Sequence, residues 1–308
     1  DSISGNDILL GIRSKDVEYQ TNESGKVVAF VQEGELWSYN QEANTLAKVF
    51  SFRGYEGVDD RENYGEHDIK IVNIDEAGSI DYIVYGYMNR GIHEGTVGIA
   101  VYHYDSLANT NEEQVFIPSS QSYEVMKSEL GQLMYVTESG AFYIMVDGNV
   151  YGIDLNSLDT KVLVEGLSDE AVAISESNRF LAWVDPSAIR GSGTIHIIDF
   201  VTEKVTDVTE STSDYVKPLG FMQEDFVYGV AKSADVVVDA AGNTLFPMYQ
   251  VKIMDTSSEE HEVLKTYEKT GYYVQNIAIS GYTIYLNRIQ NNGTAYVDAD
   301  QDMIMNRE

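Results

Sequence analysis

The sequence predicts an all-β fold built from six repeated units of short strands, with five or seven units as the alternatives. A short apolar strand that runs into Asp or Asn and a polar turn recurs at intervals of about fifty residues. Long stretches with a 3.6-residue period are absent, and only four prolines occur. Repeats of this size, each holding several strands, are typical of a β-propeller. The recurring segments are 35–40, 101–105, 150–154, 195–199, 250–255 and 294–298.

Further strands are expected around each of these segments. A polar turn such as Glu23-Ser24-Gly25 precedes an apolar, β-branched and aromatic run, and short polar residues with Gly suit a tight hairpin. Continuous apolar runs suit strands that are buried on both faces. One blade is therefore an inner strand, a turn, a second strand, a connection, a third strand ending in Asp, and an outer strand. Second strands are expected at 27–31, 82–87, 142–146, 180–184, 226–230 and 283–286, and outer strands at 45–52, 113–117, 161–164, 204–208 and 261–267.

The regular repeat predicts that residues 1–308 form one closed domain. The last repeat has little room for a fourth strand. We expect the apolar segment 8–12 to supply it and to close the ring, because closure removes two exposed sheet edges. The alternative is that residues 303–306 pair there instead.

The charge of the chain limits its partners. Fifty acidic and twenty basic residues give a net charge of -30, and a field of that sign repels phosphate backbones and anionic lipid head groups. We therefore expect neither nucleic-acid binding nor direct membrane binding, whereas a protein, peptide or glycan ligand fits. There are no cysteines, so disulfides, thiolate catalysis and cysteine-bound metals are excluded.

The start of the chain bears on localisation. The sequence begins at Asp1 without Met, and no apolar run approaches the roughly 18 residues of a membrane span. We expect an exported domain of a larger precursor, extracellular or in the cell envelope, tethered by a segment that precedes Asp1. The alternative is a cytosolic protein that has been trimmed.

The repeats resemble a known family. The fourth repeat carries the pattern best, as Ala-Ile-Ser-Glu-Ser-Asn-Arg-Phe-Leu-Ala-Trp at 173–183 followed by Ile-His-Ile-Ile-Asp at 195–199. This resembles the TolB-type repeat and the N-terminal propellers of the dipeptidyl-peptidase and prolyl-oligopeptidase group, over roughly residues 15 to 300. The resemblance implies a fold and no particular function. Peptidases of that group carry their nucleophile on a separate α/β-hydrolase domain, so no catalytic residue carries over.

Arrangements that would indicate catalysis or metal binding are weak. Gly191-Ser192-Gly193 does not fit a nucleophile elbow and predicts a turn. The acidic run at 298–302 has the spacing of a calcium loop but lacks its Gly and its final Glu, so it predicts an acidic turn. No catalytic residue, metal ligand or cofactor is therefore predicted. The strand-end residues are expected to form turns that bond their own backbone; they are Asn40, Asp105, Asp154, Asp199 and Asp255.

The hairpins between second and third strands differ in length. Glu33-Gly34 and Asp147-Gly148 predict tight turns, whereas the other four hairpins are long. In a propeller these hairpins project on the same face as the connections 53–68 and 119–131, and long loops on a rigid scaffold are where binding usually resides. The long hairpins are 88–95, 185–193, 231–246 and 287–293.

This loop face supplies the candidate ligand site. Four basic residues lie near the ends of second strands, where they are expected to face a shared cavity and to bind a carboxylate or phosphate group. The alternative is that each pairs with a nearby carboxylate. Loop histidines are free to act, and loop tyrosines are suited to stacking on a sugar or peptide. The candidate residues are Arg90, Arg190, Lys232, Arg288, His67, His93, Tyr55 and Tyr64.

These observations favour a non-catalytic binding or scaffolding module. One alternative is a carbohydrate-active hydrolase or lyase that uses loop-face carboxylates in acid and base roles. Another is a sensor domain that reports ligand capture to a larger anchored protein. The carboxylates of the enzyme alternative are Asp59, Asp60, Glu62 and Glu66.

Overall fold

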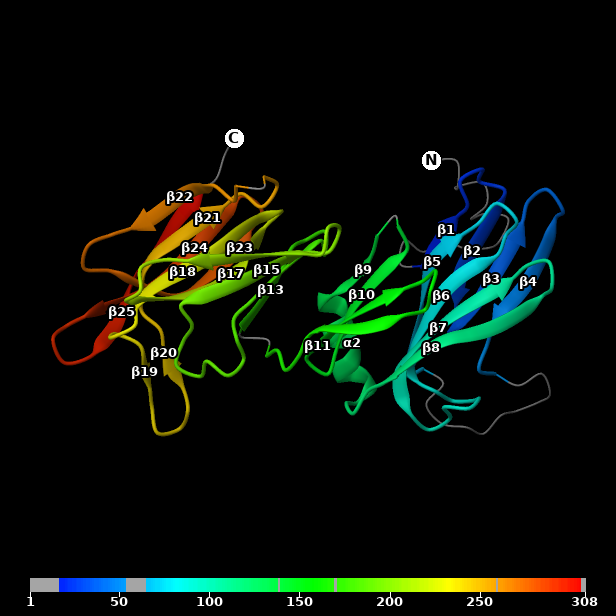
Figure 1. Ribbon diagram of the computed structural model, residues 1–308, viewed down its shortest axis with the longest axis horizontal. Helices are drawn as coiled ribbons and strands as arrows, with labels where there is room; N and C mark the ends of the chain where they lie inside the picture. Colours follow the sequence, from blue (N-terminus) through cyan, green and yellow to red (C-terminus); the bar gives the residue numbers. More distant parts are fainter. Residues whose placement is uncertain (1–16, 54–64, 138, 169–170, 259, 306–308) are drawn as a thin grey trace. The chain divides into compact units, whose positions relative to one another are not determined.

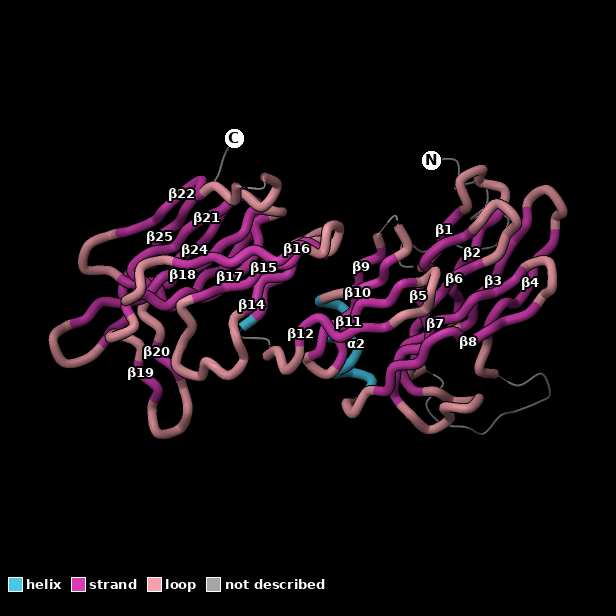
Figure 2. The backbone as a smooth tube through the Cα atoms, viewed as in Figure 1, coloured by secondary structure: helices cyan, strands magenta, loops and turns pink. Residues whose placement is uncertain are grey.

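The computed structural model shows a chain made almost entirely of antiparallel β-sheets (Figures 1 and 2). It falls into two compact units, an N-terminal unit of Asp1–Gly131 with Asn156–Leu158 and a C-terminal unit of Gln132–Leu155 with Asp159–Glu308. The single closed domain expected for residues 1–308 stays a prediction. The residues that the structure describes are 17–53, 65–137, 139–168, 171–258 and 260–305.

The N-terminal unit holds two four-stranded antiparallel sheets, each with its strands in chain order. The second and outer strands expected in these two repeats are confirmed, with ends that shift by a few residues. The strands of the first sheet are β1 (Tyr19–Thr21), β2 (Val27–Gln32), β3 (Glu35–Asn40) and β4 (Thr45–Phe50). Those of the second are β5 (His67–Ile74), β6 (Ile80–Tyr87), β7 (Val97–Asp105) and β8 (Thr110–Pro118).

Aromatic and branched side chains hold these two sheets together. Leu36 and Tyr82 are completely buried in one shared core. The rings of Tyr82 and Tyr102 stack with their centroids 5.4 Å apart, and Phe50 packs against both. Burial of such side chains contributes about 1.5 to 3 kcal/mol each relative to exposure, which explains why the apolar runs of β2 and β6 occupy the middle of their sheets.

One helix, α2 (Tyr123–Gln132), corrects the expectation of a loop at 119–131. Ser122 begins it, since its carbonyl oxygen accepts the first helical hydrogen bond from the Met126 amide at 3.0 Å. Tyr123 and Met126 are buried three residues apart on one helical face. Ser at the position before the helix and Glu124 in its first turn are ordinary start signals, but the apolar stripe is too short to stand out in the sequence.

The C-terminal unit begins with two more four-stranded antiparallel sheets in chain order. Their second and outer strands are also confirmed at the expected places. The strands of the first are β9 (Met134–Val136), β10 (Ala141–Val146), β11 (Asn149–Asp154) and β12 (Thr160–Val164). Those of the second are β13 (Val172–Ile174), β14 (Phe180–Trp183), β15 (Thr194–Asp199) and β16 (Lys204–Thr209).

A larger sheet combines the last two repeats of the chain. A single residue pair, Met248 with Val274, joins β21 to β23, so the number of blades stays a prediction. The first of these repeats contains β17 (Asp214–Met222), β18 (Asp225–Lys232), β21 (Met248–Met254) and β22 (Val263–Glu268), with the hairpin β19 (Val237–Val238) and β20 (Thr244–Leu245) inside its long loop. The last repeat contains β23 (Tyr273–Ser280), β24 (Thr283–Asn291) and β25 (Tyr296–Met305).

Strand β25 corrects two expectations. It runs from Tyr296 to Met305 and pairs with β24 on both sides of a register shift between Leu286 and Arg288, so the third strand does not end at Asp298 and residues 303–305 are no separate fourth strand. The acidic run at 298–302 is accordingly part of a strand, where a turn was expected. The closing strand expected at 8–12 lies outside the described residues.

The strand-end carboxylates form the expected turns. Asp105, Asp199 and Asp255 each accept a hydrogen bond from a backbone amide two residues further along, at 2.8, 2.9 and 2.7 Å. The two tight hairpins are confirmed as well. Glu33-Gly34 and Asp147-Gly148 have positive φ at both residues, from 53° to 74°, as a type I′ turn requires.

Serine residues of the inner turns also fasten neighbouring sheets. In the N-terminal unit, the Ser24 amide donates to the Glu76 carboxylate of the next sheet at 3.0 Å. In the C-terminal unit, Ser177 donates to Glu224 from its amide at 3.1 Å and from its hydroxyl at 2.8 Å. The same turn-to-turn contact in two repeats explains why Ser recurs at this position. Among the described residues, no helix is long and apolar enough to span a membrane.

Candidate functional site

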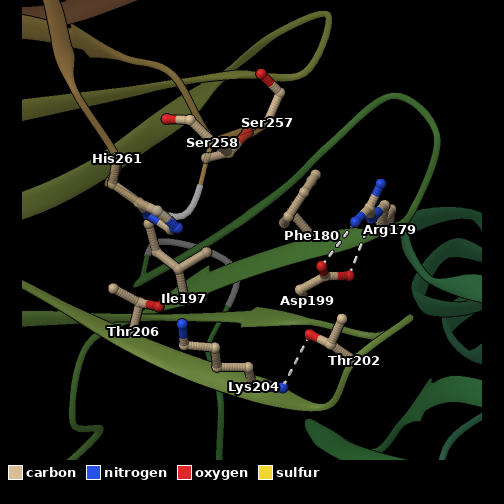
Figure 3. A pocket seen from close by; sticks show the side chains of 11 residues that line it. Arg179, Phe180, Ile197, Asp199, Thr202, Lys204, Thr206, Ser257, Ser258 and His261 are labelled. Carbon is tan, nitrogen blue, oxygen red and sulfur yellow. Dashed lines mark hydrogen bonds and ion pairs between the residues drawn. The ribbon is translucent and has the colours of Figure 1, made fainter.

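A cleft of about 380 Å³ lies between two neighbouring sheets of the C-terminal unit. One wall comes from the sheet of β13 to β16, and the other consists of Thr256, Ser257, Ser258 and His261, which follow β21 (Figure 3). The cleft lies at the end of the sheets where third strands turn into outer strands. That end is opposite to the long hairpins on which the sequence placed a ligand site.

An ion pair builds one side of the cleft. Arg179, in the turn before β14, donates from Nε and Nη2 to the two carboxylate oxygens of Asp199 at 2.9 and 2.8 Å. Burial alone would raise the pKa of Asp199, but the hydrogen bonds and charge of Arg179 outweigh it, and the pKa lies below its usual value. Arg and Asp meet here because Phe180 and Asp199 are direct partners in the β14–β15 pairing. The Asp199 charge is therefore neutralised locally.

Lys204 and His261 point into the same cleft from opposite walls (Figure 3). Lys204 begins β16, and its side chain forms no ion pair with any residue of the described ranges. His261 precedes β22, and its backbone has a positive φ of 49°. Burial, and then the nearby positive charge of Lys204, lower the pKa of His261 below its usual value, although Asp255 and Asp199 act in the opposite direction. His261 is therefore neutral at neutral pH.

The surroundings of His261 also indicate which ring nitrogen carries the proton. Its Nδ1 is buried and makes no hydrogen bond within the part of the chain that the structure describes. A buried N–H without an acceptor is rarer than a buried acceptor without a donor. We therefore assign the proton to Nε2, which leaves the neutral ring a donor at that nitrogen.

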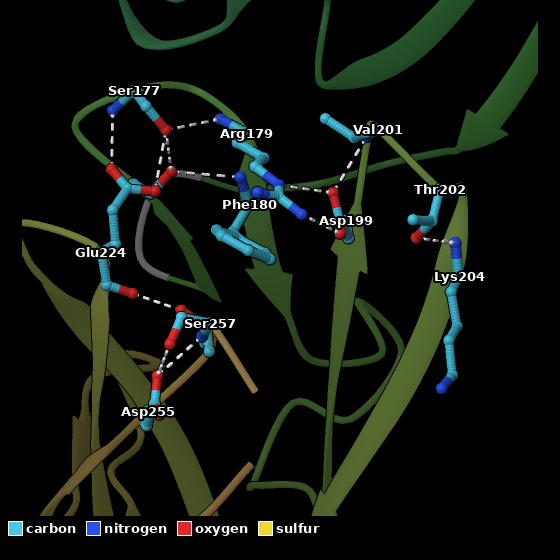
Figure 4. Close-up of polar contacts among 12 residues, drawn as sticks. Ser177, Arg179, Phe180, Asp199, Val201, Thr202, Lys204, Glu224, Asp255 and Ser257 are labelled. Atoms are coloured by element: carbon cyan, nitrogen blue, oxygen red, sulfur yellow. Dashed lines mark hydrogen bonds and ion pairs between the residues drawn. The ribbon is translucent and has the colours of Figure 1, made fainter. Parts of the chain in front are cut away.

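The carboxylates around the cleft are already satisfied. Asp199 is paired with Arg179, and Asp255 accepts from the amide and the hydroxyl of Ser257 at 2.7 and 2.6 Å (Figure 4). Hydroxyl groups of Ser258 and Thr206 line the same space. A positive ammonium group, an imidazole donor and hydroxyl donors are together suited to an oxyanion such as a carboxylate or phosphate.

A second cleft, of about 310 Å³, occupies the preceding seam of the C-terminal unit. There Glu203 reaches over from the neighbouring sheet, accepts from the Tyr143 hydroxyl at 2.5 Å and pairs with Lys161 at 2.6 Å. The lysine of this cleft is thus paired, whereas Lys204 is not paired with any described residue. Among those residues, no group of three or more His, Asp or Glu side chains could hold a metal ion.

The four basic residues predicted to share a cavity have separate partners. Arg90 lies in the N-terminal unit and donates to the Phe52 carbonyl oxygen at 2.5 Å. In the C-terminal unit, Arg190 donates to two backbone carbonyls of the 231–246 loop at 3.1 and 3.2 Å. Lys232 pairs with the Asp214 carboxylate at 2.7 Å. Arg288 is buried and pairs with the Asp302 carboxylate at 3.2 Å. The alternative, in which each basic residue pairs with a nearby carboxylate, therefore holds for Lys232 and Arg288.

The remaining predicted residues are placed as follows. His67 begins β5 and is buried, with Nε2 donating to the Gly34 carbonyl oxygen at 2.9 Å, so its expected loop position is wrong. His93 lies in a loop, where its ring stacks on Phe116 at 3.6 Å. Glu66 is exposed. Tyr55, Tyr64, Asp59, Asp60 and Glu62 lie outside the described residues.

Sequence reasoning missed both Lys204 and His261. Lys204 follows the turn after the strand-end Asp199, and His261 follows the turn after Asp255. The signal that was available is that both residues stand at or just before the start of an outer strand, in two successive repeats. This signal predicts a shared cleft only when the two sheets are known to pack side by side.

No family model and no curated protein matches the sequence. Similar solved structures include TolB of Acinetobacter baumannii, which is 14% identical with a TM-score of 0.29 over 97% of this chain and 68% of that one. Dipeptidyl peptidase 4 of Porphyromonas gingivalis is 12% identical with a TM-score of 0.33, over 95% of this chain and 55% of that one. The β-propeller domain of the Trilobed protease of Pyrococcus furiosus is 13% identical with a TM-score of 0.30, over 75% and 70%. The similarity to TolB and dipeptidyl-peptidase propellers that the repeats indicated is thus confirmed, at a level that carries no argument about function.

Proposed function

We propose that this chain is a non-catalytic binding module of the propeller type, and that the cleft around Lys204 and His261 holds an oxyanion of its ligand. The observation that carries the proposal is the ammonium group of Lys204, which points into the cleft without an ion-pair partner among the described residues. In the second cleft of this unit the lysine is paired, Lys161 with Glu203.

A net charge of -30 opposes the approach of any anion. Inside the cleft this repulsion is weaker, because the nearest carboxylates already have partners. Asp199 is neutralised by Arg179, and Asp255 is hydrogen-bonded to Ser257. Lys204 is exposed, so water and salt screen it, and a single exposed ion pair contributes at most about 1 kcal/mol. With several hydrogen bonds added, we expect a dissociation constant on the order of 1 mM for a small oxyanion. A larger ligand would add contacts outside the cleft.

Binding is tested by titrating the ¹⁵N-labelled protein with sodium phosphate, sodium sulfate and sodium acetate, with sodium chloride at matched ionic strength as the reference. We expect saturable shifts at the amides of Ser257, Ser258 and Lys204 with at least one oxyanion. Comparison of phosphate and sulfate with acetate shows whether the cleft prefers a tetrahedral or a planar oxyanion.

Two lysine variants make this experiment decisive. Lys204→Met should remove the saturable shifts, whereas Lys26→Met should keep them, because Lys26 belongs to the N-terminal unit, is exposed and pairs with Glu42. The proposal fails if no oxyanion gives saturable shifts, or if Lys204→Met binds like the unchanged protein.

The alternative functions have less support. The hydrolase or lyase needs two carboxylates in acid and base roles, and three of the four residues named for it lie outside the described ranges. The sensor differs from a binding module only through a partner domain. An extracellular location stays a prediction.

A further inference from the structure

The last three strands present one face that packs on the core of the C-terminal unit and one that points away from that core. Ile284, Leu286 and Ile304 are buried on the core side. Residues that alternate with them lie on the opposite side, because neighbouring side chains in a strand point to opposite faces. We call this side the terminal face. Its central residues are Asn276, Ala278, Tyr285, Asn287, Gln301 and Met303.

A row of amide side chains crosses the terminal face. Gln301 of β25 donates to the Asn287 carbonyl oxygen at 2.9 Å, and Asn287 of β24 donates to that of Asn276 in β23. All three residues are exposed. The row ends with free donor capacity on the Asn276 amide nitrogen and free acceptor capacity on the Gln301 oxygen. With strands about 4.8 Å apart, these ends are roughly 10 Å apart.

Apolar and aromatic side chains lie beside the amide row. Tyr285 and Met303 are direct partners in the β24–β25 pairing, and Met303 is 53% exposed. Beyond the row, the Tyr273 and Tyr296 rings meet edge to face at 5.5 Å. The face therefore offers hydrogen-bonding groups between aromatic surfaces.

The terminal face also carries little charge in a strongly acidic chain. None of its six central residues is charged, and Asp302 lies on the core side, where it accepts from the Tyr267 hydroxyl at 2.8 Å. Two exposed carboxylates lie beside these residues, Asp298 opposite Ile289 and Asp300 next to Gln301 in the strand. Such a face offers no carboxylate row for a basic peptide, and pairing it with a second copy would bring together two chains of charge -30.

We propose that the terminal face binds a neutral glycan. Sugar hydroxyl groups donate and accept at once, as side-chain amides do, and the apolar faces of sugar rings suit the flat rings of tyrosine. A sheet face with an amide row between tyrosines matches an extended, uncharged saccharide chain. This inference rests on residues far from Lys204 in the sequence and is independent of the oxyanion cleft.

The experiment is native gel electrophoresis of the full chain in gels that contain a soluble neutral β-glucan, mannan or xyloglucan. We expect at least one polysaccharide to retard the protein. Tyr285→Ala and Asn287→Leu should each weaken that retardation at least tenfold in apparent affinity. Tyr282→Ala is the matched control, since Tyr282 is 56% exposed in the turn outside the strands and should leave retardation unchanged. Lys204→Met should also leave it unchanged.

Methionine oxidation gives a second readout that does not depend on a variant folding. Met303 should oxidise readily in the free protein and more slowly with the retarding polysaccharide, whereas buried Met222 should stay protected throughout. The proposal is overturned if none of the three polysaccharides retards the protein, or if both face variants are retarded normally. It is also overturned if Met303 is already protected in the free protein, because another protein surface then covers the face.

Discussion

Replacing Asp214 by Asn should destabilise the C-terminal unit strongly, because this carboxylate is the centre of a buried polar network. Its side chain is only 3% exposed. It accepts hydrogen bonds from Lys232 at 2.7 Å, Ser211 at 2.8 Å and Tyr249 at 2.9 Å. Asparagine keeps one acceptor but turns an NH₂ group toward these donors and removes the charge that Lys232 balances.

The magnitude follows from these contacts. A hydrogen bond to a charged group contributes about 1.5 to 3 kcal/mol, and breaking a buried ion pair costs about 3 to 5 kcal/mol. Lys232 is 46% exposed, so water recovers part of the loss, and we expect about 3 kcal/mol. For a unit of this size that lowers the melting temperature by roughly 6 to 12 °C.

The assay is thermal unfolding at pH 7, with Asp207→Asn as the matched control. Asp207 is 59% exposed and bonds to His196 alone among the hydrogen bonds described, so its replacement should change stability by less than about 0.5 kcal/mol. Equal melting temperatures for the two variants would refute the reasoning.

The pH dependence provides a further check on Asp214. Burial favours a higher pKa, but the hydrogen bonds from Lys232, Ser211 and Tyr249 and the charge of Lys232 outweigh it, so the pKa lies below 3.8. A carboxylate with a lowered pKa stabilises the fold above its unfolded pKa and loses that contribution as the pH falls through the folded one. The gap between the unchanged protein and Asp214→Asn should therefore shrink below about pH 4.

Three other perturbations test the rest of the structure by thermal or chemical unfolding. Glu224→Ala removes both hydrogen bonds from Ser177 and should cost about 1 kcal/mol; an unchanged melting temperature would show that this contact does not fasten the sheets. His261→Gln should remove a loss of stability that the unchanged protein shows as the pH falls below about 6.5, because its folded pKa is lowered; parallel pH profiles would contradict this. Gly86→Ala places a Cβ against the backbone at φ +130° and should cost more than about 3 kcal/mol, whereas Gly91→Ala has open space at φ +93° and should cost about 1 kcal/mol; equal costs would contradict the tight contact.

The strand pattern was predictable because its causes are local. Apolar runs between polar turns determine which segments are strands, and a pair such as Asp147-Gly148 specifies its own turn geometry. The last repeat escaped this reasoning, since its third strand continues through Asp298, Asp300 and Asp302. An acidic strand that is exposed on one face has no apolar run to reveal it.

The site could not be predicted for a physical reason. Lys232 looked available in the sequence, but its partner Asp214 lies 18 residues away on a neighbouring strand. Likewise, Lys204 and His261 belong to different sheets, and only packing brings them to one cleft. Whether a charge is paired depends on such distant neighbours, which local patterns do not contain.

The most direct test of the oxyanion cleft is the pKa of His261, measured by NMR titration of the labelled imidazole with and without sodium phosphate. Its resonance is assigned by its loss in His261→Gln. In chloride the pKa should lie below 6.5, because of burial and the charge of Lys204. A bound anion offsets that positive charge, so saturating phosphate should raise the pKa, and Lys204→Met should weaken the response. A pKa that sodium phosphate, sodium sulfate and sodium acetate each leave unchanged at matched ionic strength would contradict the account.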